Sequence, residues 1–152
     1  MRLLQSLSQH LMTTTGLPRE NFESFAERGE LHPLFIDHGQ GIQVARFRYD
    51  GVINIESYSG DGMTLLALVT SWLSEHDGER HDIELPDPEV NVQLNDRHTA
   101  DVDITIVFDE PVNLVRDDNG PVMYDGVRWS VAESPVDVAE DLDGFEGDSD
   151  VV

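Results

Sequence analysis

The segment DGMTLLALVTSWLSEH, residues 61–76, decides the fold of this chain because it predicts a helix with apolar residues on most of its sides. Asp61 can accept hydrogen bonds from the first free backbone N–H groups, and the His76-Asp77-Gly78 run offers a stop. We therefore expect a central helix, at about residues 62–76, in the core of the protein. Its large apolar residues recur at helical spacing, and they are Met63, Leu65, Leu66, Leu68, Val69, Trp72 and Leu73.

Candidate strands lie on both sides of the central helix in the sequence. After it, apolar and polar residues alternate at Val90–Leu94 and again at Val102–Phe108, the pattern of half-buried strands. Before it, Asp50-Gly51 predicts a type I′ turn between two strands, at residues 43–49 and 52–58. We expect an α+β fold in which an antiparallel or mixed β-sheet with hairpins packs on the central helix. Shorter strands are expected near residues 112–115, 122–124 and 127–131.

The N-terminal region predicts two further helices. Leu3, Leu4, Leu7 and Leu11 form an apolar stripe on the first, which Thr13–Gly16 should end. The second is expected to start at Pro18, because proline suits the first turn of a helix. Its inward side chains would be Phe22, Phe25 and Ala26, and Arg28-Gly29 would close it.

The chain is strongly acidic, and this excludes several classes of partner. Its 31 Asp and Glu residues against nine basic residues give a formal net charge of −22, and all nine bases are arginines. A surface of this sign repels nucleic acid, so we expect no specific nucleic-acid binding. A host with a salty cytoplasm is one explanation of the acidity, since a dense acidic surface is screened there.

The C-terminal end has a composition of its own. Residues 133–152 carry many acids and no base, which predicts an acidic flexible tail that is disordered in the free protein. We therefore expect one α+β domain at residues 1–132 followed by this tail. No stretch of the chain approaches the roughly 20 apolar residues of a membrane helix, so no membrane partner is expected.

No motif in the sequence predicts catalysis, a metal site or a cofactor. The chain has no cysteine, so thiolate metal sites and cysteine nucleophiles are excluded. It also contains neither the HExxH motif of zinc enzymes nor the Gly-x-Ser-x-Gly elbow that holds a nucleophilic serine. We predict that it is not an enzyme. The residues that stand out are Arg46 and Arg48, on one face of a strand in a chain short of positive charge. They either pair with acids of their own chain or contact an acidic surface on an identical neighbour.

Several short motifs resemble the tail completion protein R family of Peduovirus-type contractile-tailed phages. They are the Phe-x-Asp-x-Gly turn at Phe35–Gly39, the helix end Ser71-Trp72-Leu73, the Asp-Ile-Thr-Ile strand at Asp103–Ile106, and the turn Tyr124-Asp125-Gly126. The resemblance covers roughly residues 1–132, and it implies a tail terminator-like domain there. It brings no catalytic residue with it.

The resemblance implies a structural virion protein that caps the head-proximal end of a contractile (myovirus) tail tube and provides the junction to the head or neck. It further implies a homomeric ring, expected to be a hexamer, assembled in the host cytoplasm. Its partners would be other copies of itself, the tail tube, the sheath and the neck or head-completion protein. Arg46 and Arg48 are then candidates for the subunit interface. Two alternatives stay open, an acidic DNA mimic or other non-enzymatic interaction protein, and a small hydrolase.

Overall fold

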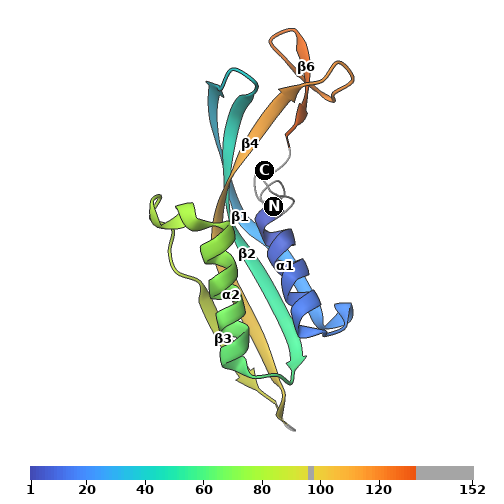
Figure 1. Ribbon diagram of the computed structural model, residues 1–152, viewed down its shortest axis with the longest axis vertical. Helices are drawn as coiled ribbons and strands as arrows, with labels where there is room; N and C mark the ends of the chain where they lie inside the picture. The colour runs from blue at the N-terminus through green and yellow to red at the C-terminus, as the bar shows by residue number, and fades with distance from the viewer. Residues whose placement is uncertain (96–97, 133–152) are drawn as a thin grey trace. The chain divides into compact units, whose positions relative to one another are not determined.

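The computed structural model describes residues 1–95 and 98–132 of the chain, and it shows an α+β protein with an antiparallel β-sheet (Figure 1). The predicted flexible tail at residues 133–152 lies outside the described residues. The expected α+β class is therefore confirmed for the part of the chain that the structure describes.

Two α-helices and six strands make up the described chain, with two short 3-10 helices. The strand order is β1-β2-β4-β6-β5, and β3 pairs separately with β4. The pairings β3–β4, β4–β6 and β5–β6 are antiparallel, with Val92 opposite Val102 and Val122 opposite Trp129. The elements are α1 Arg2–Thr15, η1 Arg19–Asn21, β1 Phe22–Asp37, β2 Ile42–Tyr58, α2 Gly62–His76, η2 Gly78–His81, β3 Glu89–Leu94, β4 Ala100–Arg116, β5 Val122–Tyr124 and β6 Val127–Val131.

The chain divides into two compact units. Unit 1 comprises Met1–Glu30 and Arg48–Asp109, and unit 2 comprises Leu31–Phe47 and Glu110–Val152, of which the structure describes residues up to 132. The strands β1, β2 and β4 each contribute residues to both units.

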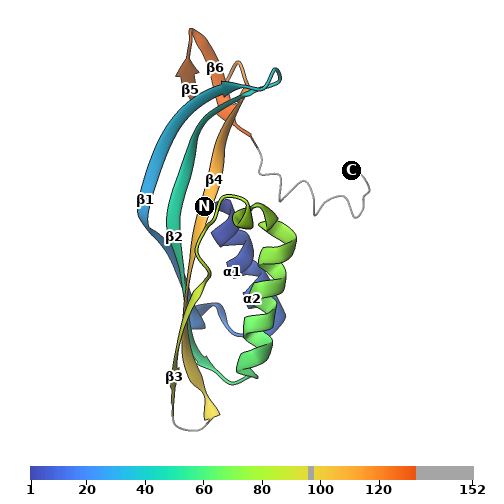
Figure 2. The ribbon, with the colours of Figure 1, turned by 90° about the vertical axis from the view of Figure 1, so that its left-hand side faces the viewer.

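Unit 1 contains a core of two helices and a sheet. Figure 2 shows α1 and α2 on the same face of the strands of this unit. The tilted rings of Tyr49 and Phe108, with centroids 5.7 Å apart, are fully buried. From the helices, α1 buries Leu3, Leu4, Leu7 and Leu11, and α2 buries Leu65, Val69, Trp72 and Leu73.

The helix α2 is less enclosed than its sequence predicts. It buries one side only, and Met63 is 74% exposed. The ring of Trp72 stacks on His76 one turn later, at 4.6 Å between centroids. Because α1 buries as many residues as α2, the core of unit 1 is shared by two helices.

Unit 2 is made of strands and turns. Its small core contains Leu114, Ala45 and Trp129, and the indole N–H of Trp129 donates a hydrogen bond to the Tyr124 carbonyl at 3.0 Å. The β5–β6 turn has positive φ at Asp125 and Gly126, as the Asp-Gly pair predicts for a type I′ turn.

The predicted second N-terminal helix is wrong. Phe22, Phe25 and Ala26 have helical spacing, but they belong to β1, which pairs with β2. None of the three is buried in the structure. Strand pairing satisfies the backbone of this segment, and it outweighs a weak helical pattern.

The predicted hairpin at Asp50-Gly51 is also wrong, because β2 continues through both residues. A Cβ atom at Gly51 would lie 3.0 Å from the ring of Phe108 and 3.1 Å from a methyl of Leu4. The glycine therefore allows close packing in the core, where a turn was expected. The hairpin lies earlier, between β1 and β2, at the connection that contains Gly39 with φ of +88°.

Two of the later strands differ from the expected ones. The predicted strands at Val102–Phe108 and residues 112–115 are one strand, β4. The strand at Val90–Leu94 exists as β3, but all six of its residues are exposed, so it is not half-buried. Exposure is high because β3 pairs with β4 alone among the described residues and lies at the edge of the sheet.

Candidate functional site

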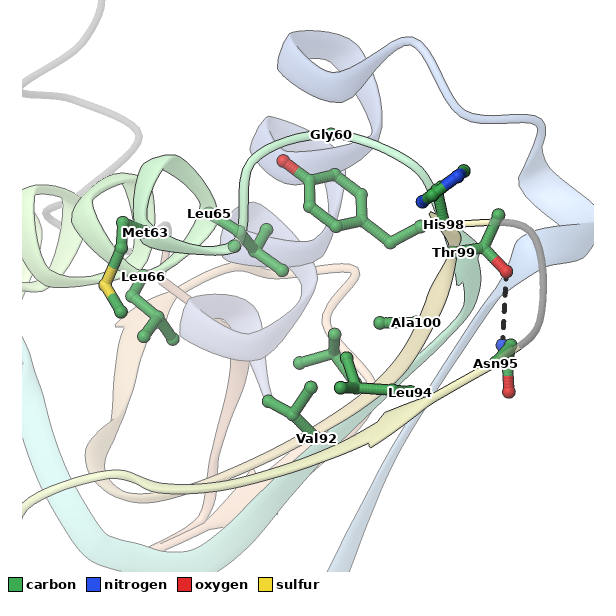
Figure 3. A pocket seen from close by; sticks show the side chains of 13 residues that line it. Gly60, Met63, Leu65, Leu66, Val92, Leu94, Asn95, His98, Thr99 and Ala100 are labelled. Carbon is green, nitrogen blue, oxygen red and sulfur yellow. Dashed lines mark hydrogen bonds between the residues drawn. The ribbon is translucent and has the colours of Figure 1, made fainter.

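Unit 1 contains an apolar groove of about 650 Å³. It lies between the first turns of α2, the strand β3 and the start of β4 (Figure 3). Figure 3 shows Val92 and Leu94 projecting from β3 toward the side where Leu65 and Leu66 project from α2. The thirteen residues that line the groove are Tyr58, Gly60, Gly62, Met63, Leu65, Leu66, Val92, Leu94, Asn95, His98, Thr99, Ala100 and Val102.

Local hydrogen bonds fix the helix side of the groove. The carboxylate of Asp61 accepts bonds from the backbone N–H of Met63 at 3.4 Å and the hydroxyl of Thr64 at 3.0 Å, so it caps α2 as the sequence predicts. The hydroxyl of Tyr58 donates to the Asp61 carbonyl at 3.1 Å. Gly60 leaves room for the Tyr58 ring, which a Cβ atom at this position would overlap.

Hydrogen bonds between polar residues at the end of β3 and the start of β4 lie at the strand side of the groove. The backbone N–H of Asn95 donates to the Thr99 carbonyl at 2.9 Å, and its amide donates to the Asp101 carboxylate at 2.8 Å. The backbone N–H of Ser57 donates to the same carboxylate at 3.0 Å. These hydrogen bonds, that of Ser57 first, lower the pKa of Asp101 below its usual value.

The lining of the groove contains no acidic side chain, although the chain carries 31 acids. Its titratable side chains are Tyr58 and His98. Burial, and then the negative charge of Asp61, raise the pKa of the Tyr58 hydroxyl above its usual value, so the hydroxyl stays neutral. The groove is therefore suited to apolar side chains.

The described residues offer no constellation for catalysis or metal binding in this groove. Within residues 1–95 and 98–132, no group of three or more His, Cys, Asp or Glu side chains could hold a metal ion. Tyr58 and His98 line the groove, and none of the other lining residues carries a carboxylate. Over the same residues, no helix is long and apolar enough to cross a membrane.

Unit 2 exposes large apolar side chains on two of its strands. The rings of Phe35 in β1 and Tyr124 in β5 stack, with centroids 5.4 Å apart. We call the exposed large side chains of these two strands in unit 2 the apolar patch. Its members are Leu31, Leu34, Phe35, Ile36, Met123 and Tyr124.

The predicted interface residues Arg46 and Arg48 both lie on β2, two positions apart. Arg46 belongs to unit 2 and Arg48 to unit 1, and both are partly exposed. Neither lines the apolar groove. A buried arginine that the sequence did not single out is Arg80, which donates to Asp77 at 2.7 Å and to the Pro86 carbonyl at 2.9 Å.

Sequence reasoning missed both the groove and the patch. One signal was available for the patch, because residues 31–36 contain four large apolar side chains and no acid in an otherwise acidic chain. The groove had a weaker signal, the alternation at Val90, Val92 and Leu94, which we interpreted as a buried strand face.

Comparisons with known proteins agree with the resemblance seen in the sequence. The model of the family described as P2 phage tail completion protein R (GpR) matches residues 1–134. A protein of Haemophilus phage HP1 (strain HP1c1), described as an uncharacterized 19.2 kDa protein in the rep-hol intergenic region, is 30% identical over 152 residues, covering 93% of this chain and 88% of the relative. No solved structure matches the chain.

Proposed function

Since this chain belongs to the P2 phage tail completion protein R family, we propose that it caps the head-proximal end of a contractile phage tail tube and provides the junction to the head or neck. The family is one of tail completion proteins, so the role in the virion tail is structural. The observation that carries the proposal is the family match, which includes every described residue.

In this proposal the active form is a homomeric ring of six copies whose partners are the tail tube, the sheath and the neck or head-completion protein. The ring acts without catalysis. A strongly negative channel suits the passage of DNA, because like charge suppresses adhesion of the duplex to the wall. The same charge makes the copies repel one another, so closure of the ring needs salt or specific contacts.

Electron microscopy of tails tests the capping function directly. Tails assembled without the protein should lack heads or vary in length, and adding the purified protein should restore head attachment. The protein should be visible at one end of the tube. Failure of the purified protein to bind any tail end would contradict the proposal.

Arg46 and Arg48 are proposed to lie at the junction between subunits of this ring. At a net charge of −22, arginine is the only strong cation that can make directed pairs with acids of a neighbour. Reversal of both to glutamate should shift the protein to monomer in sedimentation and leave tails without heads.

A matched control keeps the change in net charge constant. Arg19→Glu with Arg28→Glu adds the same negative charge elsewhere, and Arg28 makes a long pair with Asp50, at 3.9 Å. If the Arg46 and Arg48 double variant still forms rings and completes tails, these residues do not lie at the junction. Equal loss of assembly in both double variants would mean that net charge alone is responsible.

A further inference from the structure

Asn119-Gly120 is the only asparagine–glycine pair in the sequence. It lies in a turn at residues 117–120, which follows β4 and belongs to unit 2. Glycine has no side chain, so its backbone nitrogen can approach the side-chain amide of the preceding asparagine more closely than that of other residues. The pair is therefore the place in this chain where an asparagine is most open to attack by its own backbone.

The reaction at such a pair is deamidation. The nitrogen of Gly120 bonds to the side-chain carbonyl carbon of Asn119 and loses its proton, the bond from that carbon to the amide nitrogen breaks, and ammonia leaves. Water then adds to either carbonyl of the cyclic imide and opens the ring. The product is aspartate or isoaspartate, and in the latter the main chain is longer by a methylene group. Overall, the amide and water become ammonium and a carboxylate, which is ionised at neutral pH.

Hydrogen bonds within the turn hold the attacking nitrogen away from this reaction. The backbone N–H of Gly120 donates to the carbonyl of Asp117 at 2.8 Å, and the backbone N–H of Asn119 donates to the Asp117 carboxylate at 3.0 Å. Asn119 is exposed, whereas Gly120 is buried. Water can therefore reach the asparagine, but the glycine nitrogen can attack only after its hydrogen bond to Asp117 opens.

Strand β6 anchors the same turn. A Cβ atom at Gly120 would overlap the backbone carbonyl of Trp129, so the glycine backbone packs directly against the strand. The guanidinium of Arg128 donates to the Gly120 carbonyl at 3.2 Å, and the backbone N–H of Asp117 donates to the Arg128 carbonyl at 3.1 Å. The turn can therefore open fully only when these contacts with β6 break.

We propose that Asn119 is a deamidation site that the fold protects, and that its modification records the opening of the turn from β6. In the closed turn the nitrogen of Gly120 is engaged, so the imide does not form. A copy in which the turn opens can form it. This site does not depend on the proposed capping function, and the capping function does not depend on it.

Isoaspartate makes the opening permanent. Its longer main chain has to fit beside Trp129, where the backbone of Gly120 leaves no room even for a Cβ atom. The new carboxylate also follows Asp117 and Asp118 in the sequence, and like charges repel one another. A copy that reacts while its turn is open therefore cannot return to the closed turn.

Peptide mapping by mass spectrometry measures the reaction. The full-length protein is incubated at mildly alkaline pH, in buffer and in concentrated urea, and the deamidated fraction at residue 119 is followed with time. The reaction should be faster in urea by about tenfold or more, because the folded protein reacts only through its opened fraction. Asn113, which precedes leucine, should stay unmodified in both solutions. Asn119→Gln should yield no isoaspartate at this position.

A pair of arginine variants tests the anchor on β6. Arg128→Gln removes the contact with the Gly120 carbonyl, so it should speed deamidation of Asn119 several-fold in buffer. Arg19→Gln makes the same change of charge in unit 1, and it should react like the parent. In urea the two variants and the parent should react at the same rate, which assigns any difference in buffer to the fold. Hydrogen exchange at the Gly120 amide, followed by NMR, should rise in step with the rate.

The isolated product tests whether the opening is permanent. The isoaspartate form, separated by ion-exchange chromatography, should have lost the protection of the Gly120 amide from hydrogen exchange. Asn119→Asp is the matched control, because it carries the same added charge on a main chain of normal length. This variant should keep the protection, since Asn119 is exposed.

Four outcomes would overturn parts of the inference. Equal rates in buffer and urea would show that the fold does not protect Asn119, and no reaction in urea would remove it as a deamidation site. If Arg128→Gln reacts like Arg19→Gln in buffer, the contact with β6 does not control the opening. If the isoaspartate form keeps the protection of the Gly120 amide, the modified turn closes again and records nothing.

Discussion

Units 1 and 2 share three long strands, yet they differ in how many apolar side chains they bury. Among the described residues, all buried apolar side chains lie in unit 1 except Ala45, Leu114 and Trp129. Unit 2 instead exposes large side chains such as Leu31, which is 63% exposed, and Phe35. The comparison teaches that most of the buried core lies in unit 1, whereas unit 2 leaves most of its large apolar side chains exposed to contact with other molecules.

The two tryptophans give the sharpest test of this comparison. Trp72 in unit 1 and Trp129 in unit 2 are 4% and 6% exposed, so their burial is matched. Trp72→Ala should lower the free energy of unfolding by about 3 to 5 kcal/mol, because it leaves a cavity beneath α2. Trp129→Ala should lower the free energy of unfolding by a smaller amount, because the strands and turns around a small core can collapse into the space. Urea denaturation followed by circular dichroism measures both.

The same pair of variants tests the predicted single domain at residues 1–132. If the two units unfold as one domain, calorimetry should show one transition, and both substitutions should lower its midpoint. Two transitions, each sensitive to only one tryptophan, would show instead that the units fold independently.

Gly51→Ala probes the packing of the core of unit 1. The added methyl would meet Phe108 and Leu4 at about the closest distances that real Cβ contacts show, so we expect a loss of about 1 to 3 kcal/mol. Gly62→Ala is the control, since a Cβ atom there meets nothing within 4 Å. Equal stability of the two variants would mean that Phe108 and Leu4 can move to accept the added methyl group.

Ser8→Ala should make unit 1 more stable. Ser8 is buried in α1, and within the described residues its hydroxyl oxygen has no hydrogen-bond partner. Removal of an unpaired buried hydroxyl should raise the free energy of unfolding by about 1 kcal/mol, and alanine also favours the helix. A fall in the thermal midpoint would show that this hydroxyl has a partner in solution.

The smallest expected effect concerns Asp101 at the edge of the groove. Hydrogen bonds from Ser57 and Asn95 lower its pKa in the folded protein, so the carboxylate stabilises the fold above the unfolded value of 3.8, and this contribution is lost as pH falls below it. Asp101→Asn should therefore be slightly less stable than the parent near pH 7. The difference should shrink below pH 4. If the difference in stability between Asp101→Asn and the parent does not change with pH, the ionised carboxylate of Asp101 does not stabilise the fold.

The sequence predicted the elements that depend on local chemistry. The leucine stripe of α1, the Asp61 cap of α2 and the Asp125-Gly126 turn all lie where they were expected. The prediction failed where tertiary contacts determine the secondary structure. The spacing of Phe22 and Phe25 is helical, but strand pairing places them in β1.

The candidate surfaces were harder to predict than the fold. Alternation shows that one face of a strand is apolar, but not whether another element covers that face. Val92 and Leu94 therefore suggested a buried face, and only the edge position of β3 explains their exposure. The roles of Arg46 and Arg48 stay predictions, since the structure of a single chain does not show which residues contact another copy.

The surroundings of the two tryptophans have an optical consequence. The indole of Trp72 stacks on the imidazole of His76, whereas that of Trp129 lies 5.6 Å from the guanidinium of Arg116. The protein thus carries one intrinsic fluorophore in each unit, and each indole lies against a different side chain. Replacement of one tryptophan leaves the emission of the other to report on its own unit, without any added dye.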